Sequence, residues 1–340
     1  IDEHAALAME TAHDQDTRGM LGEMRERLRL DAGKTNSDLL HGATRDMAPE
    51  EKRRLLQGVY TRSQAPGESA PQPLPAPLPE GREVIAKIDG ANGSGKLKFP
   101  AVEYDLPGHT AKLIVGRDLA RHFPTIRQVR SDLQSKNVSE EALVNRFSNA
   151  ALPEDYAKVL SELPDRRLYD RVIVPVGRGA EPLVEWAKKE PAAGHVVLGE
   201  PDIYIHQMRY DDFFRTLHFH EFAHLMEKDA SAAARQAYDA GAKREAYHLR
   251  DYAWKRPGEN FSVHGGEAML GSRHIFEHAA KEAPLRSAVF GRMLQERLID
   301  LPPEMHSTMH GEWQDRIDFL ERNIVPVAQR LAARELATAR

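Results

Sequence analysis

His220, Glu221 and His224 form a His-Glu-x-x-His motif, a pattern with a defined chemistry. In a helix the two histidines lie one turn apart and face the same way, so both imidazoles can bind one metal ion. A catalytic Zn²⁺ has three protein ligands and one open position, and the glutamate of this motif can take a proton from a water molecule there. The motif therefore predicts a zinc site with Glu221 as general base.

The segment around the motif reads as a helix that is largely apolar on both faces, as expected of a buried helix. With His220 at zero on a helical wheel, His224 falls at about 40°, whereas His218 falls on the far side. We therefore expect His218 to pack in the core or to support the site rather than to bind the metal. Glu227 lies one turn beyond His224, where it would support an imidazole or lie at the surface.

The third ligand must come from elsewhere in the chain. A third histidine in the motif is excluded, because Glu227 and Ala230 stand where that continuation needs glycine and histidine. The chain has no cysteine, so a downstream carboxylate is required. The candidates are Glu245, Asp251, Glu259 and Glu267. Glu259 is the best placed, because Pro257 and Gly258 predict a turn directly before it and a new helix after it.

From Asp211 to Gly271 the sequence resembles the anthrax lethal factor family of zinc peptidases, which includes the Pro-Pro endopeptidases. The resemblance rests on the His-Glu-x-x-His motif and on a tyrosine, Tyr252, seven residues before Glu259-Asn-Phe. It implies three metal ligands, which are His220, His224 and Glu259. It also implies that Glu221 is the general base and that Tyr252 donates a hydrogen bond to the oxyanion.

The sequence departs from this family at one position. A second carboxylate often follows one turn after the ligand, and Val263 stands there instead. His264 and Glu267 are the candidates for that supporting contact, and Tyr247 is an alternative to Tyr252. The clostridial neurotoxin light chains, which also use two histidines and a glutamate, are a second group that the sequence resembles.

The expected fold is α+β, with a zincin-like metallopeptidase domain at residues 84–340. Short strands are expected between Val84 and Val115, and longer strands at Leu168–Val176 and His195–Ile205. The last of these strands leads toward the motif helix. We expect it at the edge of a small mixed sheet, where an extended peptide can pair with it.

The other elements are expected to be helices, with a helical lower half after the motif. The expected helices are Arg117–Phe123, Ser139–Phe147, Glu154–Leu163, Pro182–Lys189, Ser231–Arg250, Phe261–Lys281, Leu285–Ile299 and His310–Ala337. The glycine-rich stretch Gly90–Lys96 is expected to be a hairpin turn. It is not a phosphate-binding loop, because Leu97 stands where such a loop needs Ser or Thr.

Two regions precede this domain. Residues 1–62 read as a helical N-terminal region, for which a solvated hairpin is favoured over a module that docks a partner. Alternate prolines predict an extended Pro-rich linker at residues 63–83. Because the chain begins with Ile1 rather than Met, we expect either a removed leader or a piece of a longer polypeptide.

The composition argues against several classes of partner. Hydrophobic residues make up 41% and charged residues 29% of the 340 residues, as in soluble globular proteins. No apolar run approaches the roughly 18 residues of a membrane span. A net charge of -5 without a basic stripe argues against nucleic acid. The expected partner is a protein or peptide substrate.

These observations predict a zinc-dependent endopeptidase, and the resemblance suggests a bacterial toxin or secreted effector that is delivered to a target cell. Two alternatives stay open, a zinc-stabilised interaction module without catalysis and a zinc hydrolase that acts on other bonds. An intact Glu221 favours an enzyme, because a structural zinc site has a fourth protein ligand and no use for that carboxylate.

Overall fold

The computed structural model describes residues 77–89, 95–107, 109–135, 150–189, 193–197, 200–206, 212–247, 259–299 and 301–338. The region 1–62, most of the linker 63–83, the helix expected at Ser139–Phe147, and both Asp251 and Tyr252 lie outside these residues. The described chain divides into two compact units. One consists of Ala76–Ala120, Pro153–Met208 and Phe213–Arg340, and the described part of Arg121–Leu152 belongs to the other.

The larger unit contains a six-stranded mixed sheet with the strand order β1-β2-β3-β4-β6-β5. The strands are β1 (Arg82–Asp89), β2 (Lys96–Asp105), β3 (Lys112–Gly116), β4 (Arg171–Val174), β5 (Gly194–Val196) and β6 (Asp202–Ile205). Strands β3, β4 and β6 are parallel, whereas β1, β2 and β5 each pair antiparallel with a neighbour. The central strand β4 is an apolar run buried along most of its length, as is typical of parallel strands covered on both faces.

The strands expected between Val84 and Val115 are present. Asp89 of β1 lies opposite Lys96 of β2, so these two strands form an antiparallel pair. Most of the glycine-rich stretch predicted as a hairpin turn, residues 90–94, lies outside the described residues. The strand expected at Leu168–Val176 is shorter. Arg166–Leu168 forms a 3₁₀ turn capped by the side chain of Asp165, and only β4 continues as a strand.

The prediction of one strand at His195–Ile205 is wrong. The segment forms two strands, β5 and β6, that pair antiparallel as a hairpin. The N–H of Glu200 donates to the carbonyl of Val197 at 3.2 Å, which closes a turn in the middle of the predicted strand. Pro201 follows that turn and has no N–H to contribute to a ladder.

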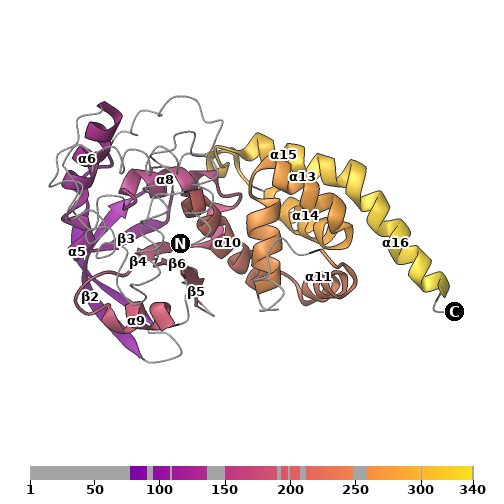
Figure 1. The fold of residues 1–340 in the computed structure, drawn as a ribbon, viewed down its shortest axis with the longest axis horizontal. Coiled ribbons are helices and arrows are strands. Elements are labelled where there is room, and N and C mark those ends of the chain that lie inside the picture. Colours follow the sequence, from indigo (N-terminus) through magenta and orange to yellow (C-terminus); the bar gives the residue numbers. More distant parts are fainter. Residues whose placement is uncertain are drawn as a thin grey trace, which may run out of the picture. The chain divides into compact units, whose positions relative to one another are not determined.

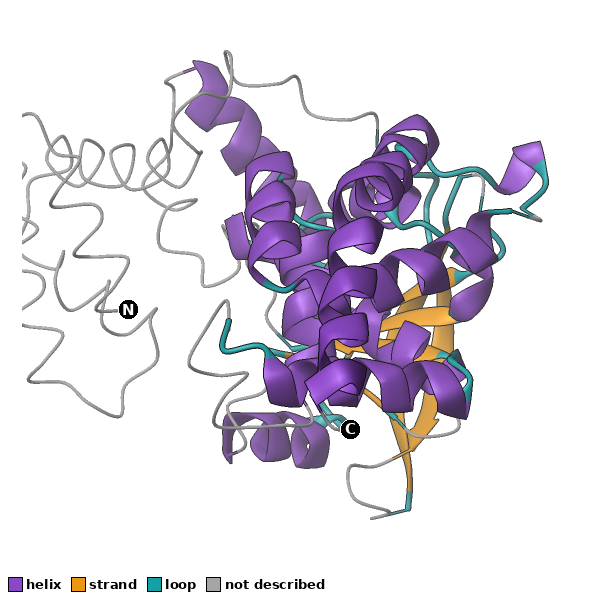
Figure 2. Cartoon of the chain, turned by 90° about the vertical axis from the view of Figure 1, so that its right-hand side faces the viewer, coloured by secondary structure: helices purple, strands orange, loops and turns teal. Residues whose placement is uncertain are grey.

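Helices cover the sheet and make up the C-terminal part of the larger unit. Those before the motif are α5 (Arg117–Ala120), α8 (Pro153–Glu162) and α9 (Glu181–Lys189), and the motif lies on α10 (Asp212–Asp229). The later ones are α11 (Ala232–Arg244), η4 (Ser262–Met269), α13 (Arg273–Glu282), α14 (Pro284–Leu298), η5 (Pro303–Met305), α15 (His310–Phe319), η6 (Leu320–Ile324) and α16 (Val325–Thr338). Figure 1 shows α10 between the strands and these later helices, and Figure 2 shows the later helices in front of the sheet.

The helix predicted at Phe261–Lys281 is wrong as a single element. The first part is the π-helix η4, in which the N–H of Leu270 donates to the carbonyl of Gly265 at 3.1 Å. The chain then breaks and restarts as α13, because the side chain of Ser272 accepts the N–H of Ile275 and caps a new helix. The other helices expected after the motif are present, with shifted ends.

Helix α10 is buried along most of its length, as its two apolar faces predict. The side chains that lie in the core are Phe214, Leu217, Phe219, Phe222, Leu225 and Met226. Burying an aromatic or large aliphatic side chain contributes roughly 1.5 to 3 kcal/mol, so this helix is held firmly in the core. A motif on such a helix has a fixed orientation.

The smaller unit contains the helix α6 (Phe123–Ser135). The buried guanidinium of Arg130 on this helix donates to the carbonyl of Ala150 at 3.0 Å. This bond connects α6 to Ala150, which is the next described residue after Ser135. This contact satisfies part of a charge that would otherwise be costly to bury.

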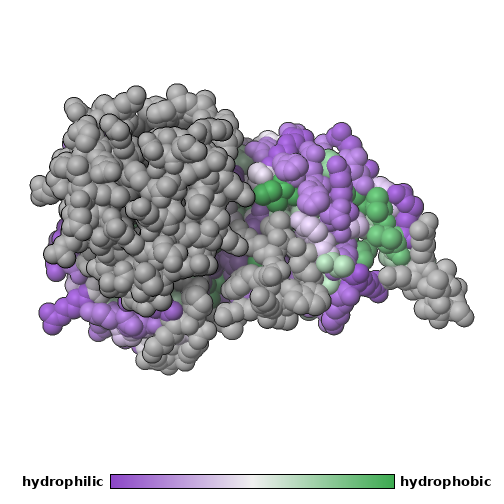
Figure 3. Space-filling view, viewed as in Figure 1, coloured by the Kyte–Doolittle hydropathy of each residue, from purple (hydrophilic) through white to green (hydrophobic). Residues whose placement is uncertain are grey.

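The visible surface of the described residues is mainly hydrophilic, with small separate hydrophobic areas (Figure 3). Large hydrophobic side chains that are exposed include Ile85, Ile275, Ile299 and Leu331. Single exposed apolar side chains are normal on soluble proteins. None of the described helices combines the length and the apolar character that a membrane crossing needs.

A pair of histidines joins β5 to the end of β6. Nδ1 of His195 and Nε2 of His206 lie 2.8 Å apart, and the two rings stack within 4° of parallel. Burial lowers the pKa of His195 to about 3 and that of His206 to about 4. Both rings are therefore neutral at pH 7, and one donates a hydrogen bond to the other.

This pair should make the free energy of unfolding depend on pH. Below the ordinary histidine pKa of 6.5 the unfolded chain binds protons that the folded chain does not, so stability falls as the pH drops from 6.5 to about 4. Each group contributes at most about 1.4 kcal/mol per pH unit. Urea unfolding across this range should show a shallower pH dependence for His195→Gln/His206→Gln. The control Val196→Leu, which keeps both rings, should retain the wild-type slope, and equal slopes for all three proteins would contradict the assignment.

Candidate metal centre

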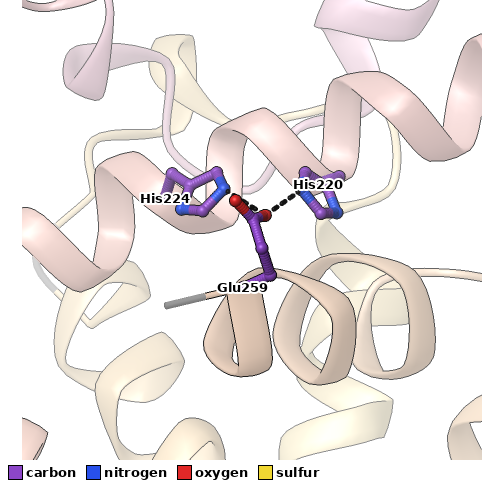
Figure 4. Close-up of side chains that lie close together, drawn as sticks. All are labelled: His220, His224 and Glu259. Carbon is purple, nitrogen blue, oxygen red and sulfur yellow. Dashed lines mark hydrogen bonds and ion pairs between the residues drawn. The ribbon is translucent and has the colours of Figure 1, made fainter. Parts of the chain in front are cut away.

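His220 and His224 project from the same side of α10 toward the carboxylate of Glu259, which lies just before η4 (Figure 4). Oε2 of Glu259 lies 3.1 Å from Nε2 of His220 and 3.2 Å from Nε2 of His224. One ligand atom of each residue lies within 4.8 Å of the other two. These three residues could hold a metal ion, and they are the three that the sequence singled out.

The hydrogen-bond partners of His220 leave a place for a cation between its ring and Glu259. Nδ1 of His220 lies 3.1 Å from Oε1 of Glu267, so the ring donates a proton on that side. A neutral imidazole has only one N–H, and its Nε2 then presents a lone pair to the carboxylate of Glu259. Either a second proton or a metal cation must lie between them. Burial lowers the pKa of His220, but the bonds to Glu259 and Glu267 outweigh it and raise the pKa to about 10.

The spacing of the ligand atoms also fits Zn²⁺. Zn²⁺ binds histidine nitrogen and carboxylate oxygen at about 2.0 to 2.2 Å, so two such atoms in a tetrahedral arrangement lie about 3.3 to 3.6 Å apart. The two contacts of Glu259, at 3.1 and 3.2 Å, are slightly shorter than that separation. Among the described residues, no fourth histidine or carboxylate belongs to this group of two nitrogens and one oxygen.

The carboxylate of Glu259 is prepared for ligation. Burial raises its pKa, but hydrogen bonds and charge from His220 and His224 dominate and hold that pKa far below the usual range. The hydroxyl of Ser262 donates to the main-chain carbonyl of Glu259 at 3.0 Å and also lies 3.4 Å from Oε2. Glu259 is therefore ionised at neutral pH and fixed in orientation.

A carboxylate lies near the other nitrogen of each histidine. Glu267 is 5% exposed and accepts from Nδ1 of His220 at 3.1 Å, so it supports this ring and is not itself the third ligand. A carboxylate in this place orients an imidazole and makes it a stronger ligand. Oε2 of Glu227 lies 4.0 Å from Nδ1 of His224, which is too far for a hydrogen bond, and burial raises the pKa of Glu227.

Two other candidates have different roles. Glu245 does not lie at the metal site, because it pairs with the buried guanidinium of Arg286 at 3.0 Å. Nε2 of His264 bonds the hydroxyl of Ser287 at 3.1 Å, whereas Glu267 makes the contact with His220. The ring of Tyr247 packs edge-on against His278.

His218 faces away from the metal ligands, as the helical wheel predicts. It is fully buried, and its Nδ1 donates to the carbonyl of Phe214 at 2.7 Å. The ring packs against Tyr156 and Phe214. Burial lowers the pKa of His218 to about 4, so the ring is a neutral core residue.

Glu221 lies next to the ligands but is not part of the ligand set. Its side chain is buried, and burial raises its pKa despite the opposing charge of His220 and His224. Its Oε2 makes no hydrogen bond to any described residue. A methyl group added to Gly194 of β5 would lie 2.6 Å from Oε1, so the carboxylate contacts the backbone of that strand. An unpaired oxygen in this setting can accept a proton from a bound water or substrate.

Two adjacent glycines allow the two ligand-bearing elements to meet. A Cβ atom on Gly266 would lie 2.5 to 2.8 Å from backbone atoms of Phe219 and His220, and one on Gly265 would lie 2.5 Å from the ring of Phe290. No larger residue fits at Gly266 without moving η4 away from α10. Sequence reasoning missed this contact, although the Gly-Gly pair just before Glu267 was a visible signal of close backbone approach.

Comparisons with protein-family models, with curated proteins and with solved structures found no match to this chain. The chemistry of the site therefore rests on its own residues.

Gly266→Ala should separate η4 from α10 and weaken the metal site. The clash with backbone atoms should cost about 1 to 3 kcal/mol of unfolding free energy, as overpacking does. It should also lower Zn²⁺ affinity, because Glu259 and Glu267 both depend on this contact. Thermal unfolding and a chelator competition assay would measure the two effects.

The matched control is Gly311→Ala on α15, because an added Cβ there meets nothing within 4 Å. This variant should stay within about 1 kcal/mol of the wild type and keep its metal affinity. If both glycine variants behaved alike, the close approach at Gly266 would not be what holds the site together.

Proposed function

We propose that this chain is a zinc-dependent endopeptidase. The observation that carries the proposal is a buried carboxylate, Glu221, with an oxygen free of hydrogen bonds to described residues, beside three residues that could hold a metal ion. A structural zinc site needs a fourth protein ligand, whereas a catalytic site keeps an open position and a nearby base. The two-histidine, one-carboxylate set fits the second case.

His220, His224 and Glu259 would hold Zn²⁺, which would supply Lewis acidity to a scissile carbonyl and to a water molecule. Glu221 accepts the proton of that water as its oxygen attacks the carbonyl carbon. The same carboxyl group then gives the proton to the amine as the C–N bond breaks, which leaves a carboxylate and a free amine. A raised pKa lets Glu221 carry the proton between the two steps.

The edge of the sheet supports a peptide as the substrate. The N–H of His206 donates to the carbonyl of Ala193, so Ala193 and His195 direct their main-chain groups toward β6. Gly194 and Val196 then direct theirs outward, where the described residues provide no further strand. Gly194 is also the residue in contact with Glu221. A peptide paired with this edge would run past the base.

The wider proposal follows the resemblance of the sequence to the anthrax lethal factor family. It includes a zincin-like arrangement of the sheet and the motif helix, an oxyanion contact from Tyr252, and a toxin or secreted effector that cleaves a protein of a target cell. These elements are analogies, and a shared site chemistry does not by itself fix the substrate. A zinc-stabilised interaction module is the rival, and loss of Glu221 would leave its activity unchanged.

Glu221→Gln should abolish hydrolysis and retain the metal. Gln cannot accept a proton, and loss of a general base costs about 10² to 10⁴-fold in rate. Zinc content should stay at one equivalent by mass spectrometry, because Glu221 is not among the ligands. Terminal proteomics on a lysate treated with wild type or variant should show new protein termini with the wild type alone.

The matched control is Glu227→Gln, a half-buried carboxylate on the same helix, which should weaken metal binding modestly and keep turnover. Full cleavage by Glu221→Gln would refute the assigned base. A wild-type protein that binds zinc but creates no new termini in any lysate would favour the interaction module.

Val196→Pro should weaken peptide binding with little effect on the fold. Pro removes an outward N–H that takes no part in the pairing with β6, so one substrate hydrogen bond is lost. At about 1 kcal/mol this should lower kcat/KM roughly threefold to tenfold, on a peptide that spans a site cut by the wild type. Val196→Ala, which keeps the N–H, is the control. Equal kcat/KM values for the two variants would place the substrate elsewhere.

A further inference from the structure

A buried ion pair lies beneath the metal site. Nε of Arg286 on α14 lies 3.0 Å from Oε2 of Glu245, and their side chains are 1% and 7% exposed. Removing two charges from water costs several kcal/mol per ion, and well-packed apolar residues often serve stability equally well. Stability alone therefore does not explain why these two charged residues are buried here.

The guanidinium of Arg286 joins three separate parts of the chain. Its Nε donates to Glu245, which follows α11, and its Nη2 donates to the carbonyl of Tyr247. Its Nη1 donates to the side-chain oxygen of Asn260 at 3.0 Å. Glu245 also accepts the main-chain N–H groups of Leu285 and Arg286 in the first turn of α14, which anchors the pair to a helix N-terminus.

Asn260 is the residue directly after the ligand Glu259. The hydroxyl of Tyr238 donates to the main-chain carbonyl of Asn260 at 3.3 Å, and the ring of Tyr238 packs on Phe261 at 4.7 Å between centroids. The same hydroxyl also lies 3.4 Å from the side-chain oxygen of Asn260. Asn260 is therefore held through its main chain by α11, and through its side chain by α14 and by this longer contact from α11. A shift of Asn260 would move the carboxylate of Glu259 relative to both histidines.

We propose that Arg286, fixed by Glu245, is a positioning residue that holds Glu259 in place for the metal through Asn260. This inference rests on the proposed metal site and adds the element that sets its affinity. Arg286 acts through its hydrogen bond to Asn260, the neighbour of Glu259 in the chain. The planar guanidinium can bond Glu245, Tyr247 and Asn260 at fixed angles, so the ion pair fixes the position of Asn260.

The test compares metal binding in two variants of the full-length protein. Asn260→Leu removes the acceptor and keeps the ion pair, whereas Arg286→Met/Glu245→Leu removes the pair and fills its volume. Both should bind Zn²⁺ about 10 to 100-fold more weakly in competition with a chromophoric chelator, as loss of supporting contacts does. The visible absorption spectrum of the Co²⁺ form should also change, because the ligand geometry changes.

Two controls separate positioning from stability. Asn260→Asp keeps an oxygen acceptor for Arg286 and should retain Zn²⁺ affinity and the Co²⁺ spectrum. Arg292→Gln/Glu296→Gln removes an exposed ion pair on the same helix and should change neither. The thermal unfolding midpoint of each metal-free protein should stay within a few degrees of the wild type.

The outcomes distinguish this inference from the proposed function. A wild-type protein that binds no Zn²⁺ refutes the metal site itself. If the wild type binds Zn²⁺ and Asn260→Leu binds it equally well with the same Co²⁺ spectrum, Arg286 does not position Glu259. If Asn260→Leu unfolds without metal, the contact is structural and the inference is likewise overturned.

Discussion

The carboxylate of Glu259 faces Nε2 of two imidazoles. Burying these three groups together without a cation costs free energy. Three carboxylates, Glu221, Glu259 and Glu267, lie around His220 and His224 in a mostly buried setting. With neutral imidazoles the group has an excess of negative charge that a divalent cation would balance. Without a cation, the negative charge is balanced only if the imidazoles are protonated. The bonds to Glu259 and Glu267 therefore raise the pKa of His220.

The backbone makes this meeting possible. Helix α10 supplies both histidines from a core position, and η4 approaches it closely only because Gly266 has no side chain. A π-helix places its residues at a different angular spacing from an α-helix, and such elements are frequent at functional sites. Here the π-helix brings Glu267 to Nδ1 of His220, while Glu259, which precedes the π-helix, faces Nε2 of both histidines.

Much of the site could be predicted from the sequence, because its central part is local. Spacing within one helix fixed the directions of His218, His220 and His224, and the turn before Glu259 favoured it as a ligand. The roles of Glu245 and Glu267 could not be separated in this way. Both are downstream carboxylates, and only the packing of α14 and η4 sends one to Arg286 and the other to His220.

The local elements of the fold could also be predicted from the sequence. Apolar runs and turn residues predicted the β1–β2 hairpin and the helices after the motif, since those signals are also local. The single strand expected at His195–Ile205 was wrong because its apolar character continues through a turn closed between Val197 and Glu200. That turn reverses the chain, so the short strand β5 rather than β6 forms the edge of the sheet, beside Glu221.

The site therefore has two sides with separate tasks. Glu221 follows His220 directly in the sequence, and one residue turns a helix by about 100°, so the base points toward β5 while the ligands point toward η4. In this proposal, contacts that would support a bound metal come from the helices, through Glu267, Asn260 and Arg286. Contacts that would hold a peptide come from the sheet edge. Because these two sets share no side chain, we expect metal affinity and substrate choice to change independently, although one helix, α10, connects them.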